Sequence, residues 1–228
     1  MDVRRATVVA EPGWQVGLVW AGFPLAGAGV LFGLKSIAGW VAGLSWAPMQ
    51  GPFRLVASIP EPWGTVGSLG AGLVLGLVVA AIAAHERLTV EVFNEGVELE
   101  RGGKTWNVDR TLVSGVFLDG KKLVLLGVDT GELARESHDL DAGALADAFQ
   151  THGYQWLDGD PYAADYRRWV SGTPDLPPGA DALLKVRADA LRKDDGEDAA
   201  QLREELARLG VVVREDRKKR QFWRLTRP

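Results

Sequence analysis

Hydrophobic residues are distributed very unevenly along this chain. Between residues 12 and 84 the only charged residues are Lys35, Arg54 and Glu61, whereas charge is dense from residue 85 onward. A single globular core would spread its charged positions along the whole chain. The pattern therefore predicts two parts that face different solvents.

Two uncharged runs, residues 12–34 and 62–84, are each long enough to cross a bilayer. An α-helix rises about 1.5 Å per residue, so roughly 20 helical residues span the hydrocarbon core. We expect transmembrane helices at about residues 14–34 and 64–84, within an anchor that covers residues 1–86. Trp14 and Trp63 stand at the starts of the two runs, where interfacial tryptophans are common.

Glycine is abundant in the anchor. The pairs Gly29-x-x-x-Gly33 and Gly72-x-x-x-Gly76 have the spacing that lets helices approach closely in lipid. We expect both pairs to pack the two spans against each other. Residues 36–60 are apolar but interrupted by Gly and Pro. They could form an interfacial helix, a re-entrant segment, a continuation of the first helix, or a third crossing.

Positive charges flank the outer ends of the two spans. Arg4 and Arg5 precede the first span and Arg87 follows the second, and basic residues favour the cytoplasmic side. With an even number of spans both ends lie on one side, so we expect a multi-pass protein of the cell membrane with a cytoplasmic soluble part. A cleaved signal peptide is the alternative for the first run, although Glu11 argues against it. The second span contains no ionisable residue, so we do not expect transport by this chain alone.

The middle of the chain predicts an antiparallel β domain followed by one helix. Apolar and polar residues alternate between residues 88 and 135 in about six short segments separated by turns. Asp119-Gly120 is a strong hairpin signal among these turns. Residues 141–152 then predict a helix with Asp141 as its N-cap.

This order, a meander of strands closed by one helix directly after a membrane span, resembles the bacterial pleckstrin-homology-like (PH-like) domains. The resemblance implies an antiparallel β-barrel with a C-terminal helix over residues 87–153, and we place Trp106 and Phe117 in its core. Domains of this fold bind different ligands in different proteins. The resemblance therefore implies no particular activity.

Residues 154–180 form an aromatic and Pro-rich linker that contains all three tyrosines of the chain. Disordered linkers are poor in aromatic residues, so we expect this one to wrap against the barrel. A partner-binding aromatic patch is the alternative. Beyond it, residues 181–193 and 197–209 predict amphipathic helices, Gly210 ends the second, and residues 211–213 and 221–225 predict two strands around a charged turn.

Residues 181–228 resemble the small C-terminal domain of cysteinyl-tRNA synthetases, which in that family helps to read the tRNA anticodon. The resemblance is carried by Arg187-Ala188, Lys193-Asp194, Leu202-Arg203-Glu204-Glu205-Leu206, Leu209-Gly210-Val211-Val212 and Trp223-Arg224. The chain departs from the family in the turn, where Arg217-Lys218-Lys219-Arg220 replaces the usual polar residues. The catalytic parts of the synthetase are missing, so aminoacylation is not expected.

The order of all these parts makes the chain similar to the YqeB-type bacterial membrane proteins. The stretch from Gly153-Tyr154-Gln155-Trp156 to Arg168-Trp169-Val170 adds to the similarity. Membership implies the architecture and adds no known activity. The anchored half therefore has to be interpreted from its own residues.

Composition excludes several chemistries. The 228 residues contain no cysteine and three histidines that are far apart in sequence, which rules out disulfides, thiolate nucleophiles and cysteine-bound zinc. No P-loop, H-E-x-x-H or G-x-S-x-G motif occurs. A net charge of −4 gives no overall attraction to nucleic acid. We therefore expect no enzyme, no cofactor and no metal site.

Two functions stay open. The first is a membrane-anchored, cytoplasm-facing scaffold that binds an unknown protein partner and could form homo-oligomers. The second is a membrane-tethered RNA- or tRNA-binding module, because basic residues can hold phosphates while aromatic rings stack on bases. Its candidate contacts are Arg217, Lys218, Lys219, Arg220, Trp223 and Arg224. The same cations could meet an anionic membrane surface instead. The competing interpretation, which we favour, is a solvated turn with Trp223 packed on the two helices.

Overall fold

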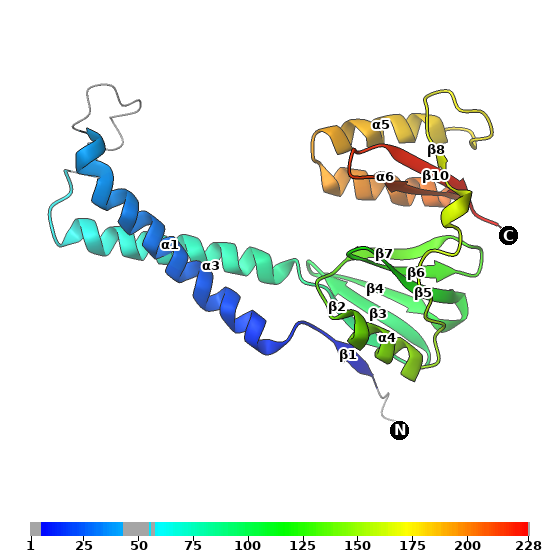
Figure 1. Ribbon diagram of the computed structural model, residues 1–228, viewed down its shortest axis with the longest axis horizontal. Helices are drawn as coiled ribbons and strands as arrows, with labels where there is room; N and C mark the ends of the chain where they lie inside the picture. The colour runs from blue at the N-terminus through cyan, green and yellow to red at the C-terminus, as the bar shows by residue number, and fades with distance from the viewer. Residues whose placement is uncertain (1–5, 43–54, 56–57, 228) are drawn as a thin grey trace. The chain divides into compact units, whose positions relative to one another are not determined.

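The computed structural model of the protein describes residues 6–42, 55 and 58–227 (Figure 1). Two compact units divide the chain. The helical unit consists of Ala10–Arg87 and Arg101–Lys104, and the sheet unit consists of Met1–Val9, Leu88–Glu100 and Thr105–Pro228. Arg4 and Arg5, on which the expected orientation depends, lie outside the described residues.

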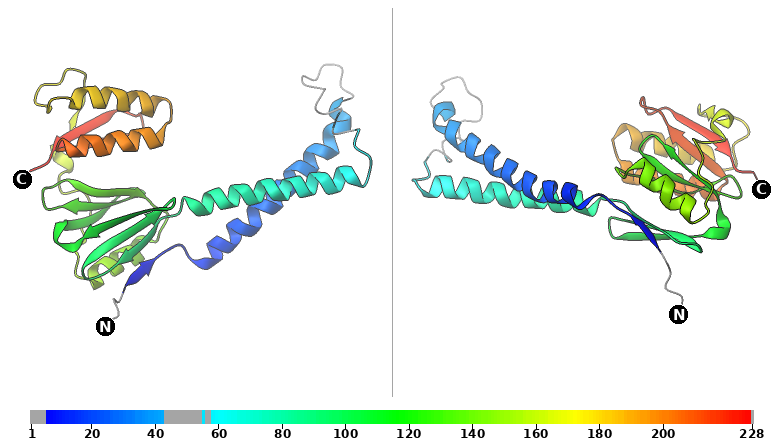
Figure 2. Two further views of the ribbon diagram at one scale, coloured as in Figure 1. Left: turned by 180° about the vertical axis from the view of Figure 1, so that it is seen from behind. Right: turned by 60° about the horizontal axis from the view of Figure 1, so that its bottom comes forward.

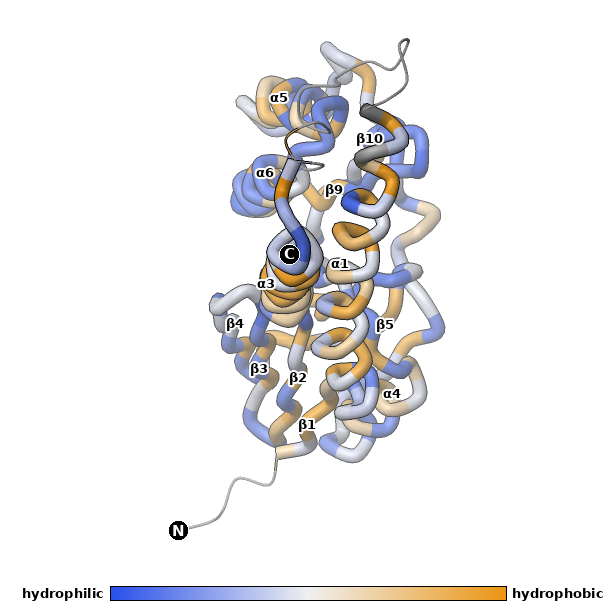
Figure 3. Tube along the Cα trace, turned by 90° about the vertical axis from the view of Figure 1, so that its left-hand side faces the viewer, coloured by the Kyte–Doolittle hydropathy of each residue, from blue (hydrophilic) through white to orange (hydrophobic). Residues whose placement is uncertain are grey.

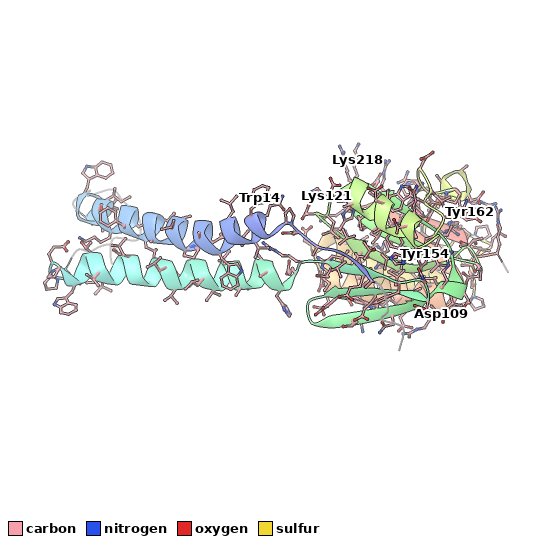
Figure 4. All side chains as sticks on the ribbon, turned by 90° about the horizontal axis from the view of Figure 1, so that it is seen from below. Trp14, Asp109, Lys121, Tyr154, Tyr162 and Lys218 are labelled. Atoms are coloured by element: carbon pink, nitrogen blue, oxygen red, sulfur yellow. The ribbon has the colours of Figure 1, made fainter. Side chains whose placement is uncertain are left out.

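The helical unit consists mainly of two long antiparallel helices, α1 (Gly13–Ala42) and α3 (Trp63–His85), which lie side by side (Figures 1 and 2). Both are strongly apolar along their length (Figure 3). Within their most apolar windows only 11% and 17% of the residues are buried, whereas the core helix of a soluble protein is mostly buried. The two helices are thus long and apolar enough to cross a membrane. Trp14 lies at the beginning of α1 (Figure 4).

The helix α1 continues to Ala42, beyond the end expected near residue 34. The continuation of the first helix is therefore confirmed for residues 36–42. An interfacial helix, a re-entrant segment or a third crossing would involve residues 43–54 and 56–57, which lie outside the described residues.

The two helices touch through glycine. A Cβ atom on Gly72 would clash with the backbone of Gly27 and Ala28, and one on Gly76 would clash with the backbone of Phe23. These close approaches need glycine, because any other side chain would push the helices apart. The prediction for Gly72 and Gly76 is confirmed.

The prediction for Gly29 and Gly33 is wrong. Nothing lies within 4 Å of the position that a Cβ atom would take on either residue. Gly29 follows Gly27 by two positions, which is about 200° around the helix, so it points away from α3. Gly27, which the sequence analysis did not single out, occupies the contact instead.

The sheet unit begins with a PH-like domain of two antiparallel sheets. The first has the strand order β1-β2-β3-β4 and the second the order β5-β6-β7. Their bounds are β1 (Thr7–Val9), β2 (Thr89–Val92), β3 (Gly96–Arg101), β4 (Lys104–Asp109), β5 (Val113–Asp119), β6 (Lys122–Gly127) and β7 (Glu132–Ser137). The PH-like architecture is confirmed, with the difference that the two sheets do not close into a barrel.

One helix covers this domain. The helix α4 (Ala142–Thr151) begins at Asp141, whose side chain accepts a hydrogen bond from the backbone N–H of Ala144, as expected of an N-cap. Its apolar face places Leu145 and Phe149 in the core. Phe117 is buried, and Trp106 packs against the core from its edge. A short 3₁₀ turn, η1 (Arg110–Leu112), connects the two sheets.

The strand β1 precedes the first apolar helix and was not predicted. Its residue Thr7 pairs with Val92 of β2, and Val9 pairs with Val90 and is buried in the core. The ring of His152, at the end of α4, adds a second attachment. Its Nε2 lies 2.9 Å from Thr7 Oγ1, and its Nδ1 lies 2.7 Å from the side-chain oxygen of Asn94. One strand of the PH-like domain is therefore supplied from before the helical unit.

The C-terminal part of the sheet unit is a small α+β domain. Its elements are β8 (Arg167–Arg168), α5 (Ala180–Arg192), α6 (Gly196–Arg208), β9 (Val211–Glu215) and β10 (Gln221–Leu225). The strands have the order β8-β10-β9, and both helices lie on one face of the sheet (Figure 2). Gly210 has φ +72°, the left-handed conformation that a helix-ending glycine adopts. The predicted helices and hairpin are confirmed.

The aromatic linker packs against the PH-like domain, as expected, and also against the C-terminal domain, which was not expected. Tyr154 is buried in the PH-like core and Trp156 packs against it. Tyr162, next to the 3₁₀ turn η2 (Ala163–Asp165), packs against the cluster around Phe117, whereas Trp169 packs against the C-terminal core. These rings serve packing within the sheet unit, which speaks against an exposed aromatic patch.

Candidate binding site

The basic turn between β9 and β10 is well formed and exposed. The Asp216 carboxylate accepts hydrogen bonds from the backbone N–H groups of Lys218 and Arg220, both at 2.9 Å, and pairs with the Arg220 guanidinium at 2.6 Å. The Arg220 side chain is the first cause of the lowered pKa of Asp216. Lys219 pairs with Asp194 at 2.6 Å. Two cations of the turn, Lys219 and Arg220, are thus held by carboxylates.

The other two cations, Arg217 and Lys218, are exposed and have no ion pair with any described residue. Lys218 lies at the outer surface of the domain (Figure 4). A surface site on this turn would therefore depend mainly on these two side chains.

Trp223 and Arg224 do not belong to this surface. They are 2% and 3% exposed, so neither can stack on a base or reach a phosphate at the tip of the turn. Trp223 packs with Leu184 and Leu206 beneath the helices, which confirms the interpretation that we favoured. Residues of β10 point alternately to its two faces, so Arg224 faces the opposite way.

A buried arginine joins α5 to the hairpin. Arg187 donates hydrogen bonds to the backbone oxygen of Ala199 at 3.0 Å, to the side-chain oxygen of Gln221 at 2.8 Å and to the Glu215 carboxylate at 2.5 Å. Lys122 of β6 pairs with the same carboxylate at 3.1 Å. Burial alone would raise the pKa of Glu215, but the two cations outweigh burial and lower it to about 2. This network is structural.

On the other face of β10, arginines stack on the linker tyrosines. The Arg214 guanidinium lies 3.9 Å from the centre of the Tyr166 ring, and Arg224 lies 5.4 Å from it. Arg224 and Arg227 lie 4.9 Å and 5.5 Å from the centre of the Tyr162 ring, which Figure 4 labels. Such contacts stabilise by about 0.5–2 kcal/mol each. The sequence analysis did not single out this arginine–tyrosine stack, whose paired members are between 48 and 65 positions apart in the sequence.

Next to the stack lies a buried carboxylate of β7. Glu132 Oε1 accepts from Arg135 at 2.9 Å, whereas its Oε2 is buried without a partner among the described residues. Burial raises the pKa of Glu132, although Arg135 and Arg203 oppose the shift. Glu132, Arg135 and Arg203 also line a cavity of about 180 Å³ at β7, α6 and β9. Glu136 and Glu204 line it as well, so three carboxylates and two guanidinium groups surround this cavity.

The outward face of the first sheet is acidic. Glu91 of β2 stands directly opposite Glu98 of β3, and both alternate with buried residues that face the core. Glu95, Glu98 and Asp109 line a depression of about 260 Å³ beside them. We call Glu91, Glu95, Glu98 and Asp109 the acidic face.

No group of three or more metal-binding side chains occurs among the residues that the structure describes. His152 is engaged with Thr7 and Asn94. His138 is buried, and burial lowers its pKa. The histidines are not brought together with one another into a shared site.

Comparison with known proteins places the chain in a family. The sequence profile of the family described as "YqeB-like bacterial PH domain" matches residues 7–157, and that of "Cysteinyl-tRNA ligase anticodon binding domain" matches residues 173–224. The first profile covers β1, both apolar helices and the PH-like domain. No solved structure matches the chain.

The chain belongs to the family of bacterial proteins with a YqeB-like PH domain. A relative from Bacillus subtilis (strain 168), named "Uncharacterized protein YqeB", is 35% identical over 219 residues, which cover 96% of this chain and 91% of the relative. The expected resemblance to YqeB-type proteins and the resemblance of the tail to the synthetase domain are both confirmed.

Proposed function

We propose that the protein is a membrane-anchored scaffold without catalytic activity. Its helices α1 and α3 cross the cell membrane as a hairpin, and its sheet unit binds a protein partner at the cytoplasmic surface. The observation that carries the proposal is the pairing of β1 with β2, because these strands flank the two apolar helices.

The pairing limits the topology of the anchor. β1 ends four positions before Gly13, and β2 begins four positions after His85. Glu11 and Arg87, at the two ends of the hairpin, also form an ion pair at 3.2 Å. The pairing supports a topology in which both ends lie on one side of the membrane, with an even number of crossings. The basic residues Arg4, Arg5 and Arg87 favour the cytoplasm for that side.

The acidic face supports a protein as the partner. Like charges directly opposite each other on neighbouring strands are destabilising, so Glu91 and Glu98 cost stability in the free protein. A basic partner would remove this repulsion, whereas an anionic lipid surface would increase it. We therefore propose a basic protein segment as the partner of the acidic face.

The test separates binding from stability. The double variant Glu91→Gln/Glu98→Gln should be more stable than the wild type by about 0.2–1 kcal/mol, because the repulsion is removed. Chemical cross-linking in membranes of the host cell should give a discrete product with the wild type, and this product should be absent for the double variant. The exposed residue Asp147 of α4 provides a matched control, since Asp147→Asn changes one charge away from the acidic face. Equal cross-linking by the double variant and the wild type would refute the proposed surface.

RNA binding is the second candidate, favoured by the match of residues 173–224 to an anticodon-binding domain. If the turn contacts phosphates, replacing Arg217, Lys218, Lys219 and Arg220 by Gln should weaken tRNA binding. Each lost contact should flatten the slope of log K against log salt by about 0.7. Because β8 and Trp169 complete the C-terminal core, the experiment uses the full chain in detergent. We expect no salt-sensitive binding, and tight binding that this replacement abolishes would favour the RNA module.

A further inference from the structure

The basic turn between β9 and β10 carries two cations that the proposed scaffold leaves without a role. Arg217 and Lys218 are exposed and have no ion pair with any described residue. The backbone beneath them is held in place, because the Asp216 carboxylate accepts hydrogen bonds from the N–H groups of Lys218 and Arg220. The turn therefore presents two uncompensated positive charges from a well-ordered backbone.

The acidic face of the first sheet has the opposite charge. In the part of the chain that the structure describes, Glu91, Glu95 and Glu98 have no ion pair. The depression of about 260 Å³ beside them is lined by Glu95, Glu98 and Asp109 and also by Phe93. Carboxylates pair with lysine and arginine head groups, and an aromatic ring attracts the same cations. The depression is therefore suited to a basic side chain.

These two complementary surfaces do not meet within one chain. Among the described residues no ion pair joins the basic turn to the acidic face. Lys218 and Asp109, which Figure 4 labels, lie apart on the sheet unit. A second copy of the chain, however, offers each surface its complement.

We propose that the basic turn of one copy binds the acidic face of a second copy. The inference rests on the proposed function, in which the acidic face takes a basic protein segment, and it names that segment as Arg217-Lys218 of another copy. The contact relieves the repulsion between like charges on both surfaces. Because the two surfaces differ, each copy in a pair keeps one acidic face or one basic turn free. Further copies add to these free surfaces, so the contact builds chains or rings.

The membrane determines where this assembly forms. Exposed ion pairs are individually weak and are screened by salt, so the contact does not hold dilute soluble copies together. Anchoring by α1 and α3 confines the copies to one surface and raises their effective concentration. Self-assembly therefore belongs to the anchored protein.

The test uses the full chain in phosphatidylcholine vesicles. The chain has no cysteine and Gln150 is exposed on α4, so Gln150→Cys provides a single position for a donor or an acceptor dye. Energy transfer between wild-type copies should exceed that of copies distributed at random. Raising the ionic strength from about 0.05 M to about 0.5 M should remove most of this excess.

Reversal of the charges on either surface should disrupt the contact. We expect Glu91→Lys/Glu98→Lys and Arg217→Glu/Lys218→Glu, each alone, to weaken the association by about tenfold or more. A mixture of the two variants should restore it, because the reversed surface of each variant complements the unchanged surface of its own kind on the other. This rescue would not follow from a merely structural effect of the substitutions.

A matched control reverses two cations elsewhere. Lys185 of α5 and Lys193 at its end are exposed, and Lys185→Glu/Lys193→Glu should leave the energy transfer unchanged. An equal loss in this control would indicate unspecific attraction and would overturn the proposal. So would a mixture of the two reversed variants that associates no better than either variant alone.

The melting temperature of each variant verifies its folding. If Glu91→Lys/Glu98→Lys does not fold, unchanged energy transfer by Arg217→Glu/Lys218→Glu refutes the contact. Cross-linking in host-cell membranes separates this inference from the proposed function. A product that requires Glu91 and Glu98 but survives Arg217→Glu/Lys218→Glu would identify another protein as the partner and overturn self-assembly alone. A product that depends on neither surface would refute both proposals.

Discussion

Arg187 has almost no contact with solvent, yet it carries a full charge. Its position is tolerable because the guanidinium satisfies three acceptors on three different segments: the end of the first turn of α6, Gln221 of β10 and Glu215 of β9. Removing one member of a buried pair leaves the other charge uncompensated, at a cost of about 3–5 kcal/mol. The Arg187 side chain thus links three segments of the C-terminal domain, and losing one of its charged partners is costly.

We expect Glu215→Gln to destabilise the protein at neutral pH and to have little effect in acid. The pKa of Glu215 falls from 4.5 to about 2 in the folded state. A carboxylate whose pKa is lower in the folded than in the unfolded protein stabilises the folded state at pH values above the unfolded-state pKa. This stabilisation is lost as the pH falls through the folded-state pKa. The difference in unfolding free energy should reach about 3 kcal/mol at neutral pH.

Urea unfolding at a series of pH values between 7 and 2 would measure this difference. Glu205→Gln removes a carboxylate from an exposed pair with Arg208 and should change stability by less than about 1 kcal/mol. A difference for Glu215→Gln that stays constant down to acid pH would contradict the assignment.

Trp223→Ala should unfold the C-terminal domain. Truncating a buried tryptophan costs about 3–5 kcal/mol, which is a large part of the stability of so small a module. Replacing the four basic residues of the turn should instead barely move the melting temperature, because exposed charges contribute little. Near-ultraviolet circular dichroism would follow the loss of tertiary packing. A folded Trp223→Ala protein would mean that this side chain is not part of the core.

At the scale of elements, glycine determines how α1 and α3 pack. The two helices approach so closely at Gly27, Gly72 and Gly76 that their backbones are in contact. In lipid such contacts replace the hydrophobic effect as the source of helix association. Glycine is disfavoured in a helix in water by about 1 kcal/mol relative to alanine. The close packing of the two backbones explains why glycine is present at these three positions.

We expect Gly72→Val to separate the two helices and Gly29→Val to leave them together. The first variant places a branched side chain against the backbone of Gly27, whereas the second places the same side chain in open space. Thermal unfolding in detergent micelles, followed by circular dichroism, should show a lower midpoint for Gly72→Val alone. Equal effects of the two substitutions would show that general helix propensity, and not the contact, is responsible.

The long elements could be predicted from the sequence and the short ones could not. Both apolar helices, the six-strand meander and the pair α5 and α6 carry enough residues for a hydrophobic period to be visible. β1 has three residues and β8 has two, and each exists only because a distant strand accepts its hydrogen bonds. Spacing showed that glycines are paired, but it could not show which side of α1 faces α3.

The candidate sites also differ in whether a local sequence pattern reveals them. The basic turn was visible as a run of adjacent cations, whereas the arginine–tyrosine stack joins residues of the linker to residues of β9 and β10. Nothing in the local pattern around Arg224 distinguishes a buried cation from a solvated one. The only indication is the alternation along β10, which directs the Arg224 side chain to the face opposite the buried Trp223.

For the whole molecule, the pairing of β1 with β2 predicts the topology. Reporters fused after Arg5 and after Pro228 should both be active in the cytoplasm, because the two strands share one sheet. The protein should also stay with membranes through alkaline carbonate washing. Reporters on opposite sides, or release by alkali, would refute the hairpin.

A fragment that begins at Arg87 should be soluble but incomplete. It lacks β1, so the edge of β2 is unpaired and the core loses Val9. Exposed strand edges promote association, and we therefore expect this fragment to self-associate in size-exclusion chromatography. Residues 6–9 joined to its N-terminus through a flexible linker should restore the monomer. A fragment that is already monomeric and equally stable without them would show that β1 is dispensable.

The same strand has a consequence for the biosynthesis of the protein. β1 leaves the ribosome first, and its partner β2 is made only after both apolar helices. Joining chain ends that are about 80 residues apart is entropically unfavourable in a free chain. Insertion of the helices as a hairpin would bring these ends together beforehand, as the ion pair between Glu11 and Arg87 indicates. Completion of the sheet would then depend on successful membrane insertion, and a chain that fails to insert would expose the open edge of β2 to proteases.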